Sequence, residues 1–167
     1  MRIASPDKDF CQSVQGQRVV LYDRKTKHVT DEAGVQARLG VAPAQVAAWL
    51  ALVGDTADGI PGIERWGEKS AALVLNRYGS IDAIPRDAQS WDVPVRGRLA
   101  LCTALNQARA QAALYEQLAT LRTDVPLTES LDELQWQGPH WAELEAVCRE
   151  LKAPDVIERV TKLRARA

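Results

Sequence analysis

Two pairs of aspartates are the groups in this sequence best suited to do chemistry. Asp7 and Asp9 flank Lys8 near the N-terminus, and Asp55 and Asp58 stand in "ALVGDTADGIPGI". Mg²⁺ and Mn²⁺ prefer carboxylate oxygens, so two acidic pairs that converge would suit a phosphodiesterase whose metals activate water and neutralise the leaving oxygen. Each pair alone also has a structural interpretation, because aspartate is common in solvated turns and at helix caps. Their order, with a Gly-Pro turn directly after the second pair, favours the metal interpretation.

The segment 59–71, "GIPGIERWGEKSA", predicts a helix end, a tight hairpin and a new helix. Gly62 and Gly67 permit backbone conformations that are closed to other residues. Amides exposed at the hairpin and at the start of the new helix can donate to phosphate oxygens. Positive charge is added on the same side by Arg65, Lys69 and Arg77. The segment predicts a helix-hairpin-helix that binds DNA backbone without sequence preference; the alternative is an ordinary helical corner with solvated charges.

The elements that must position these groups follow from the surrounding patterns. The residues 1–5 and 18–22 predict two strands, with a polar hairpin after the second. Asp7 and Asp9 then fall in a loop after the first strand, where open α/β sheets bind their ligands. Asp31 is expected to cap a helix that ends at Gly40. Further helices are expected at 43–53, 68–78, 96–121, 141–151 and 155–166.

Composition narrows the class of protein. With 167 residues, 46% of them hydrophobic and 26% charged, the chain is expected to be globular, with no transmembrane run and no signal-peptide pattern. Three scattered cysteines argue against a disulfide framework or a zinc site and favour a reducing cytoplasm. The net charge of −1 gives no global attraction for nucleic acid, so DNA binding would need local patches.

Three stretches together resemble the bacterial 5′–3′ exonuclease family, part of the 5′-nuclease and flap-endonuclease superfamily that includes the N-terminal domain of bacterial DNA polymerase I. They are "SPDKDFCQSV", "ALVGDTADGIPGIERWGEKSAALVLNRYGS" and "LATLRTDVPL". The resemblance implies that four aspartates are catalytic metal ligands for Mg²⁺ or Mn²⁺: Asp7, Asp9, Asp55 and Asp58. It also implies a helix-hairpin-helix that holds DNA and binds K⁺ through backbone carbonyls, with DNA-binding residues Gly62, Arg65, Gly67, Lys69, Ser70 and Arg77.

The fold class implied is α/β giving way to all-α. A partial PIN-like, Rossmann-like sheet at 1–42 would be followed by the helix-hairpin-helix (SAM-like) domain at 43–127 and a C-terminal helical extension at 128–167. The expected function is a cytoplasmic, metal-dependent 5′-nuclease in DNA replication or repair. Its substrate is a 5′ flap, a nick or a duplex end, three possibilities that the sequence leaves open.

Two departures from the family pattern shape these expectations. Arg65-Trp66-Gly67 replaces the usual G-x-G, so that Arg65 would supply a charge-assisted contact. Trp66 is expected to pack between the hairpin helices, with contact to DNA as the alternative. The family's upstream segment, with a first-strand aspartate, an acidic cluster and a basic arch, is not found before Met1. We therefore expect weak or no activity from this chain alone, with a DNA polymerase or a chain supplying the N-terminal part as partner. A non-catalytic, structure-specific DNA-binding module and a gene fragment are the alternatives.

Overall fold

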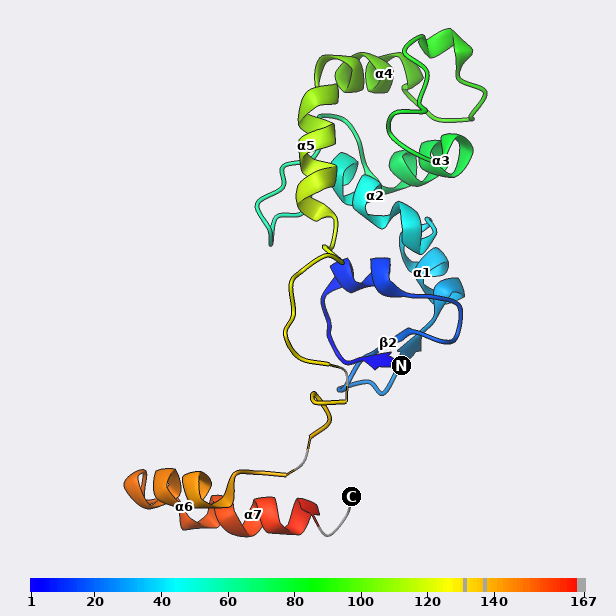
Figure 1. Cartoon of the computed structure of the whole chain (residues 1–167). Helices are drawn as coiled ribbons and strands as arrows, with labels where there is room; N and C mark the ends of the chain where they lie inside the picture. The colour runs from blue at the N-terminus through cyan, green and yellow to red at the C-terminus, as the bar shows by residue number, and fades with distance from the viewer. Residues whose placement is uncertain (131, 137, 165–167) are drawn as a thin grey trace. The chain divides into compact units, whose positions relative to one another are not determined.

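The computed structural model describes residues 1–130, 132–136 and 138–164 (Figure 1). It divides into two compact units, Met1–Thr123 and Asp124–Ala167. The predicted boundary at residue 127 lies near this division, whereas the one at residue 42 lies inside the first unit and stays a prediction.

The first unit opens with a small three-stranded sheet. The strands are β1 (Arg2–Ile3), β2 (Val20–Tyr22) and β3 (Val29–Thr30), in the order β1-β2-β3. β1 pairs with β2 in parallel and β2 with β3 antiparallel, so that the predicted polar hairpin joins the last two strands. Asp23 shapes its tip by accepting a hydrogen bond from the Lys25 amide at 2.7 Å.

A 3₁₀ helix, η1 (Lys8–Ser13), connects β1 to β2 where a loop was expected. Cys11 of η1 is fully buried. Gln12 joins η1 to the end of a helix more than a hundred residues later, because its amide donates to the Ala119 carbonyl at 2.8 Å and accepts from the Leu121 amide at 3.2 Å. These distant contacts, which no local pattern reveals, hold the 3₁₀ helix in place.

The helix α1 (Glu32–Leu39) has the ends that the sequence predicts. The Asp31 carboxylate accepts the Gly34 amide at 2.9 Å, and Gly40 adopts φ +76° after the last turn. A short 3₁₀ helix, η2 (Pro43–Gln45), then leads into α2 (Val46–Val53).

The helix α2 forms the centre of the first unit. Its residues Val46 to Leu52 are all buried. The helices α3 (Glu68–Tyr78) and α5 (Arg109–Ala119) pack against it, together with η1 (Figure 1). A helix that is apolar all round is suited to such full burial.

The region predicted as one helical stretch at 96–121 contains two helices, α4 (Arg98–Gln107) and α5. Ala108 breaks the stretch, with φ −120° and ψ 19°. The Arg109 guanidinium follows the break and donates to the carbonyls of Ile81 and Ile84 at 3.2 and 2.7 Å. These bonds tie the start of α5 to the connection that contains η3 (Ala88–Ser90).

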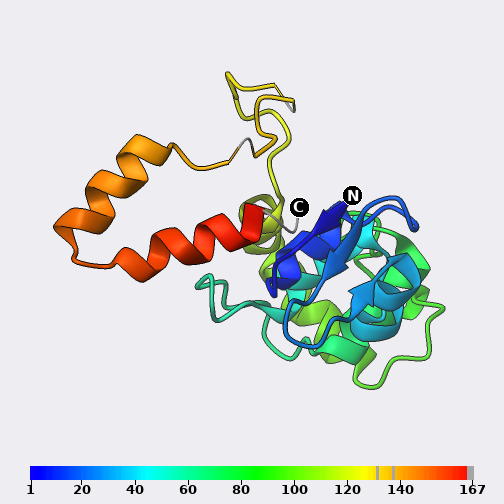
Figure 2. The ribbon, with the colours of Figure 1, turned by 90° about the horizontal axis from the view of Figure 1, so that it is seen from below.

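The second unit contains α6 (Trp141–Glu150) and α7 (Pro154–Arg164), which pack together as a helical hairpin (Figures 1 and 2). The predicted end of the last helix at residue 166 lies outside the described residues. Among the helices that the structure describes, none is both long enough and apolar enough to cross a membrane. The chain is therefore α/β at its start and helical afterwards, as predicted.

Candidate metal centre and nucleic-acid interface

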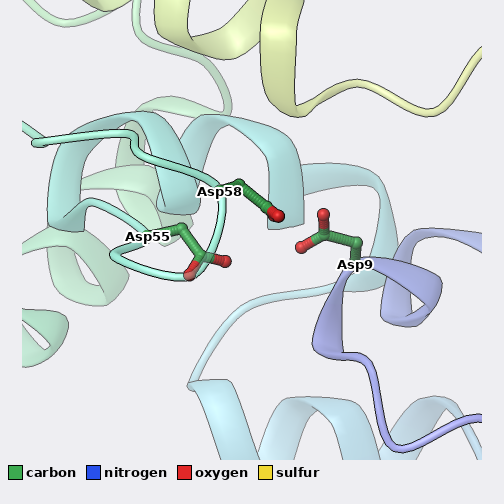
Figure 3. Close-up of side chains that lie close together, drawn as sticks. All are labelled: Asp9, Asp55 and Asp58. Carbon is green, nitrogen blue, oxygen red and sulfur yellow. The ribbon is translucent and has the colours of Figure 1, made fainter.

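Three of the four predicted metal ligands come together. Asp9, Asp55 and Asp58 each offer a carboxylate oxygen, and these oxygens lie within 4.8 Å of one another (Figure 3). Asp55 is only 3% exposed, Asp9 is partly buried and Asp58 is exposed. The cluster therefore has a buried inner side and an open outer side.

A closed loop after α2 presents Asp55 and Asp58. The helix ends at Gly54, which has φ +92°, and Asp55 and Ile60 then exchange two backbone hydrogen bonds of 2.7 and 2.8 Å. Within the loop the Asp55 Oδ1 accepts the Ala57 amide at 3.1 Å. The two carboxylates thus belong to a hydrogen-bonded loop that follows the helix.

The 3₁₀ helix η1 presents Asp9, and Asp7 has a different position. Asp7 is the N-cap of η1, and its Oδ1 accepts the Asp9 amide at 3.0 Å. Its carboxylate is not among the three that converge. Within the first pair, Asp7 therefore has the structural role, because it caps η1 and fixes the backbone that carries Asp9. Asp9 is the member that could bind a metal.

The surroundings of Asp9 disfavour an uncompensated negative charge. Burial, followed by the charge of Asp7 and by the contact with Asp58, raises the pKa of Asp9 to about 6. Its Oδ1 is buried and has no hydrogen-bond partner among the described residues. A buried polar atom without a partner is rare in folded proteins and calls for an explanation such as a bound ion.

Lys8 is a cation in direct contact with this cluster. Its Nζ lies 2.9 Å from Asp55 Oδ2, with the Lys8 side chain 32% exposed and that of Asp55 4% exposed. A cavity of about 320 Å³ adjoins the cluster and is lined by residues of η1, α1 and the acidic loop, among them Asp7, Lys8, Arg38, Asp55 and Asp58. Three carboxylates, one of which has an oxygen without a partner among the described residues (Asp9 Oδ1), form a set of ligands that fits a hard divalent cation.

The predicted hairpin begins in direct contact with the acidic loop. A Cβ on Gly62 would lie 2.6 Å from the Gly54 nitrogen and from the Val53 carbonyl carbon, so backbone meets backbone there. The Ile63 amide donates to the Leu52 carbonyl at 2.8 Å. The hairpin is thereby fixed to the end of α2, from which the Asp55 loop also starts.

The tip of the hairpin is polar outside and apolar inside. Arg65 is exposed and has φ +70°, the left-handed conformation usual for glycine. Trp66 is 5% exposed, packs against Trp91 with ring centroids 6.1 Å apart, and donates its indole N–H to the Leu101 carbonyl at 3.1 Å. Trp66 is therefore buried, and these contacts join it to Trp91 and α4; packing between the two hairpin helices stays a prediction.

The start of α3 is open to an external partner. Gly67 precedes the helix, and no side chain caps its first amides. A Cβ on Gly67 would meet nothing within 4 Å. Lys69 is exposed and Ser70 is partly buried in the first turn. Uncapped amides at a helix N-terminus suit an anion.

Arg77, at the other end of α3, forms an ion pair with Asp92 that the sequence did not indicate. Its Nε lies 2.8 and 2.9 Å from the two Asp92 oxygens, and the Tyr78 hydroxyl donates to Asp92 Oδ1 at 3.0 Å. The contact raises the pKa of Arg77 and lowers that of Asp92. The guanidinium is thus engaged within the protein.

Sequence reasoning missed the roles of two residues in this region. Lys8 was noted only as the residue between two aspartates, although a cation in that position is a natural counter-charge. Gln12, which holds η1 in place, carries no local signal, because its partners Ala119 and Leu121 are 107 and 109 residues away.

Comparison with known proteins gives consistent similarities. The family model "5'-3' exonuclease, C-terminal SAM fold" matches residues 41–142. DNA polymerase I of Pseudomonas aeruginosa is 37% identical over 158 residues, which is 90% of this chain and 16% of that protein. The flap endonuclease Xni of Serratia proteamaculans is 35% identical over 133 residues, covering 80% of this chain and 50% of that enzyme.

Solved structures give the same result for the fold. A structure of the T5 5′-exonuclease with bound divalent metal ions (zinc) aligns with a TM-score of 0.59 at 19% identity, over 71% of this chain and 42% of that one. The chain thus spans half or less of these relatives.

Proposed function

The chain belongs to the 5′–3′ exonuclease family, as its motifs predicted, and from this we propose that it acts on DNA as a metal-dependent 5′-nuclease. The proposed reaction is hydrolysis of phosphodiester bonds near 5′ ends, in DNA replication or repair and in association with a DNA polymerase. Because the chain spans half or less of its relatives, we propose that it cleaves weakly alone and that a chain supplying the remaining part would raise its activity.

The convergence of Asp9, Asp55 and Asp58 carries the proposal. These three carboxylates would hold Mg²⁺ or Mn²⁺, and Asp7 would position Asp9 by capping η1. A bound divalent ion supplies water activation and neutralises charge on the leaving oxygen. The protein itself would bury Asp55 and fix its carboxylate through the hydrogen bond from the Ala57 amide. Asp58, which is exposed, would complete the site on the side open to substrate.

The hairpin and the start of α3 would hold the duplex by its phosphates. The exposed charges there balance, since Glu64 and Glu68 offset Arg65 and Lys69. Backbone amides near Gly67 would then provide most of the attraction, and the hairpin carbonyls would bind K⁺. Arg77 would have to leave Asp92 to reach a phosphate, so we propose for it a smaller share of the binding.

Asp58→Asn gives the cleanest test of the metal-dependent reaction, because Asp58 is exposed and its replacement leaves the core intact. The assay measures cleavage of labelled 5′-flap, nicked and blunt duplexes in Mn²⁺ and in Mg²⁺. We expect wild-type cleavage to depend on the added metal and to be lost in this variant. Asp82→Asn, at an exposed aspartate outside the cluster, is the matched control and should cleave as wild type. Equal cleavage by Asp58→Asn and wild type would overturn the proposal.

A non-catalytic DNA-binding module is the second candidate, favoured by the completeness of the hairpin and α3 within the first unit. Tight binding of flap DNA in EDTA, without cleavage in any metal, would select it. Gly67→Ala tests the hairpin under either candidate, because the free protein has room for the methyl group. Reduced DNA affinity at unchanged stability is the expected result, and unchanged affinity would remove the α3 start from the interface.

A further inference from the structure

Both carboxylate oxygens of Asp55 are in use within the protein. Oδ1 accepts the Ala57 amide at 3.1 Å, and Oδ2 lies 2.9 Å from Lys8 Nζ. Asp55 is also the most enclosed charged side chain among the described residues, at 3% exposed. A buried carboxylate is costly unless a counter-charge and hydrogen bonds compensate it. Lys8 is the group that supplies this counter-charge.

The same carboxylate is one of the three that converge around the candidate metal centre. A divalent ion held by Asp55 would place two positive centres next to one another. Two unit charges 4 Å apart repel by about 1 kcal/mol even in bulk water, and a divalent ion doubles that repulsion. Lys8 and a divalent ion therefore compete for Asp55.

The side chain of Lys8 is able to give way. It is 32% exposed, so its ammonium can move to water while the apolar stem stays in place. Its backbone, in contrast, is held in η1 next to Asp9, and Asp7 caps that helix. The ammonium consequently stays close to the cluster and can return to Asp55 whenever the metal leaves.

We propose that Lys8 is a resident counter-cation of Asp55, which a divalent ion must displace, and that Lys8 thereby sets the metal affinity of the site. This inference rests on the proposed metal-dependent function. In the metal-free protein, Lys8 joins η1 to the acidic loop and keeps Asp55 in position. In the metal-bound protein, that contact is lost and its stabilising effect with it.

The test is calorimetric titration of the full chain with Mn²⁺, comparing wild type with Lys8→Met and Arg38→Met. Arg38 lines the same cavity but makes no ion pair within the described residues, so its variant measures the effect of losing a nearby charge without a contact. Lys8→Met should bind Mn²⁺ roughly tenfold more tightly or better, from the loss of a cation close to the ion. Arg38→Met should change affinity less than about threefold, and that change should vanish at high salt, where charges more than about 3 Å apart are screened.

Thermal unfolding supplies a second measurement that does not depend on activity. In EDTA, Lys8→Met should unfold at a lower temperature than wild type, whereas in saturating Mn²⁺ the difference should disappear. Lys8→Arg keeps the charge and, because guanidinium binds carboxylate at two points, should bind Mn²⁺ no more tightly than wild type. This variant keeps the inference testable even where Lys8→Met does not fold.

The outcomes separate this inference from the proposed function. Mn²⁺ binding of equal strength in wild type, Lys8→Met and Arg38→Met would overturn the role of Lys8 and leave the metal centre standing. Weaker binding by Lys8→Met would overturn it too, because Lys8 would then organise the site for the metal. Absence of Mn²⁺ binding in all the proteins would overturn the metal centre, and the role of Lys8 with it.

Discussion

Replacing Gly62 by alanine tests whether the hairpin and the acidic loop are one structural piece. A Cβ at this position would lie 2.6 Å from the Gly54 nitrogen and the Val53 carbonyl carbon, and 2.7 Å from the Val53 oxygen. All these atoms are backbone at the end of α2, which no rotamer change can move. The methyl group must therefore push the hairpin away from the helix.

The size of the effect follows from two contributions. Gly62 has φ +74°, where an alanine costs about 1–2 kcal/mol. Overpacking against backbone adds about 1–3 kcal/mol, so that Gly62→Ala should lower the free energy of unfolding by about 2–5 kcal/mol in all. Gly59 is the matched control, because it has φ +71° and nothing within 4 Å of an added Cβ. Its alanine variant should lose only the conformational part, about 1–2 kcal/mol.

Urea unfolding followed by tryptophan fluorescence measures both variants, since Trp49, Trp66 and Trp91 are buried in the first unit. With a denaturant dependence of about 1–3 kcal/mol per molar urea, the midpoint of Gly62→Ala should fall by roughly 1 M or more below wild type. Mn²⁺ affinity should fall with it, because the displaced hairpin pulls on the loop that begins at Gly54. Equal destabilisation by Gly62→Ala and Gly59→Ala would refute the close-contact argument.

Three further outcomes are expected. Arg65→Gly removes an exposed side chain at φ +70°, so the free energy of unfolding should stay level or rise by up to about 1 kcal/mol. The magnitude of the slope of log DNA affinity against log salt concentration should fall by about one unit, and an unchanged slope would exclude a phosphate contact. Because the folded pKa of Asp9 is raised to about 6, the native protein binds more protons than the unfolded chain between about pH 4 and 6, and stability in EDTA should decline as pH rises through this window. Asp9→Asn should abolish that component, as urea titrations at several pH values would reveal. Trp66→Phe deletes the indole bond to the Leu101 carbonyl and should cost about 1–3 kcal/mol, measured by thermal unfolding, with no loss of DNA affinity beyond that due to unfolding.

The parts of the fold that the sequence predicted well are those with local causes. The helix α3 has its predicted bounds, Glu68 to Tyr78, because glycines stand at both ends. The helix α1 likewise follows from an aspartate cap at Asp31 and a left-handed Gly40. Each signal acts within a few residues, so a single sequence contains it in full.

The parts that the sequence did not reveal have distant causes. Spacing alone cannot show that Asp7 turns back to cap η1, while Asp9 alone joins Asp55 and Asp58. That outcome depends on where η1 lies, and Gln12 fixes η1 through partners at the far end of α5.

A similar limit applies to the predicted cationic surface of the hairpin. The charge of Arg77 pointed to phosphate, but Asp92 lies in a separate connection and engages the guanidinium. The prediction of a cationic surface also counted Arg65 and Lys69 without the neighbouring Glu64 and Glu68, whose negative charges balance them. Residue type therefore indicated which groups could act, whereas tertiary pairing decides which of them are free to do so.

The close contact between Gly54 and Gly62 has a consequence for the proposed nuclease. One glycine ends the helix from which the Asp55 loop starts, and the other lies in the hairpin proposed to hold duplex DNA. With no side chain between them, the two segments cannot move apart without losing the Ile63 to Leu52 backbone bond. In the proposed nuclease, backbone geometry would then set the distance from the duplex to the metal centre. A site built in this way would choose its phosphodiester by position along the bound strand and not by base identity.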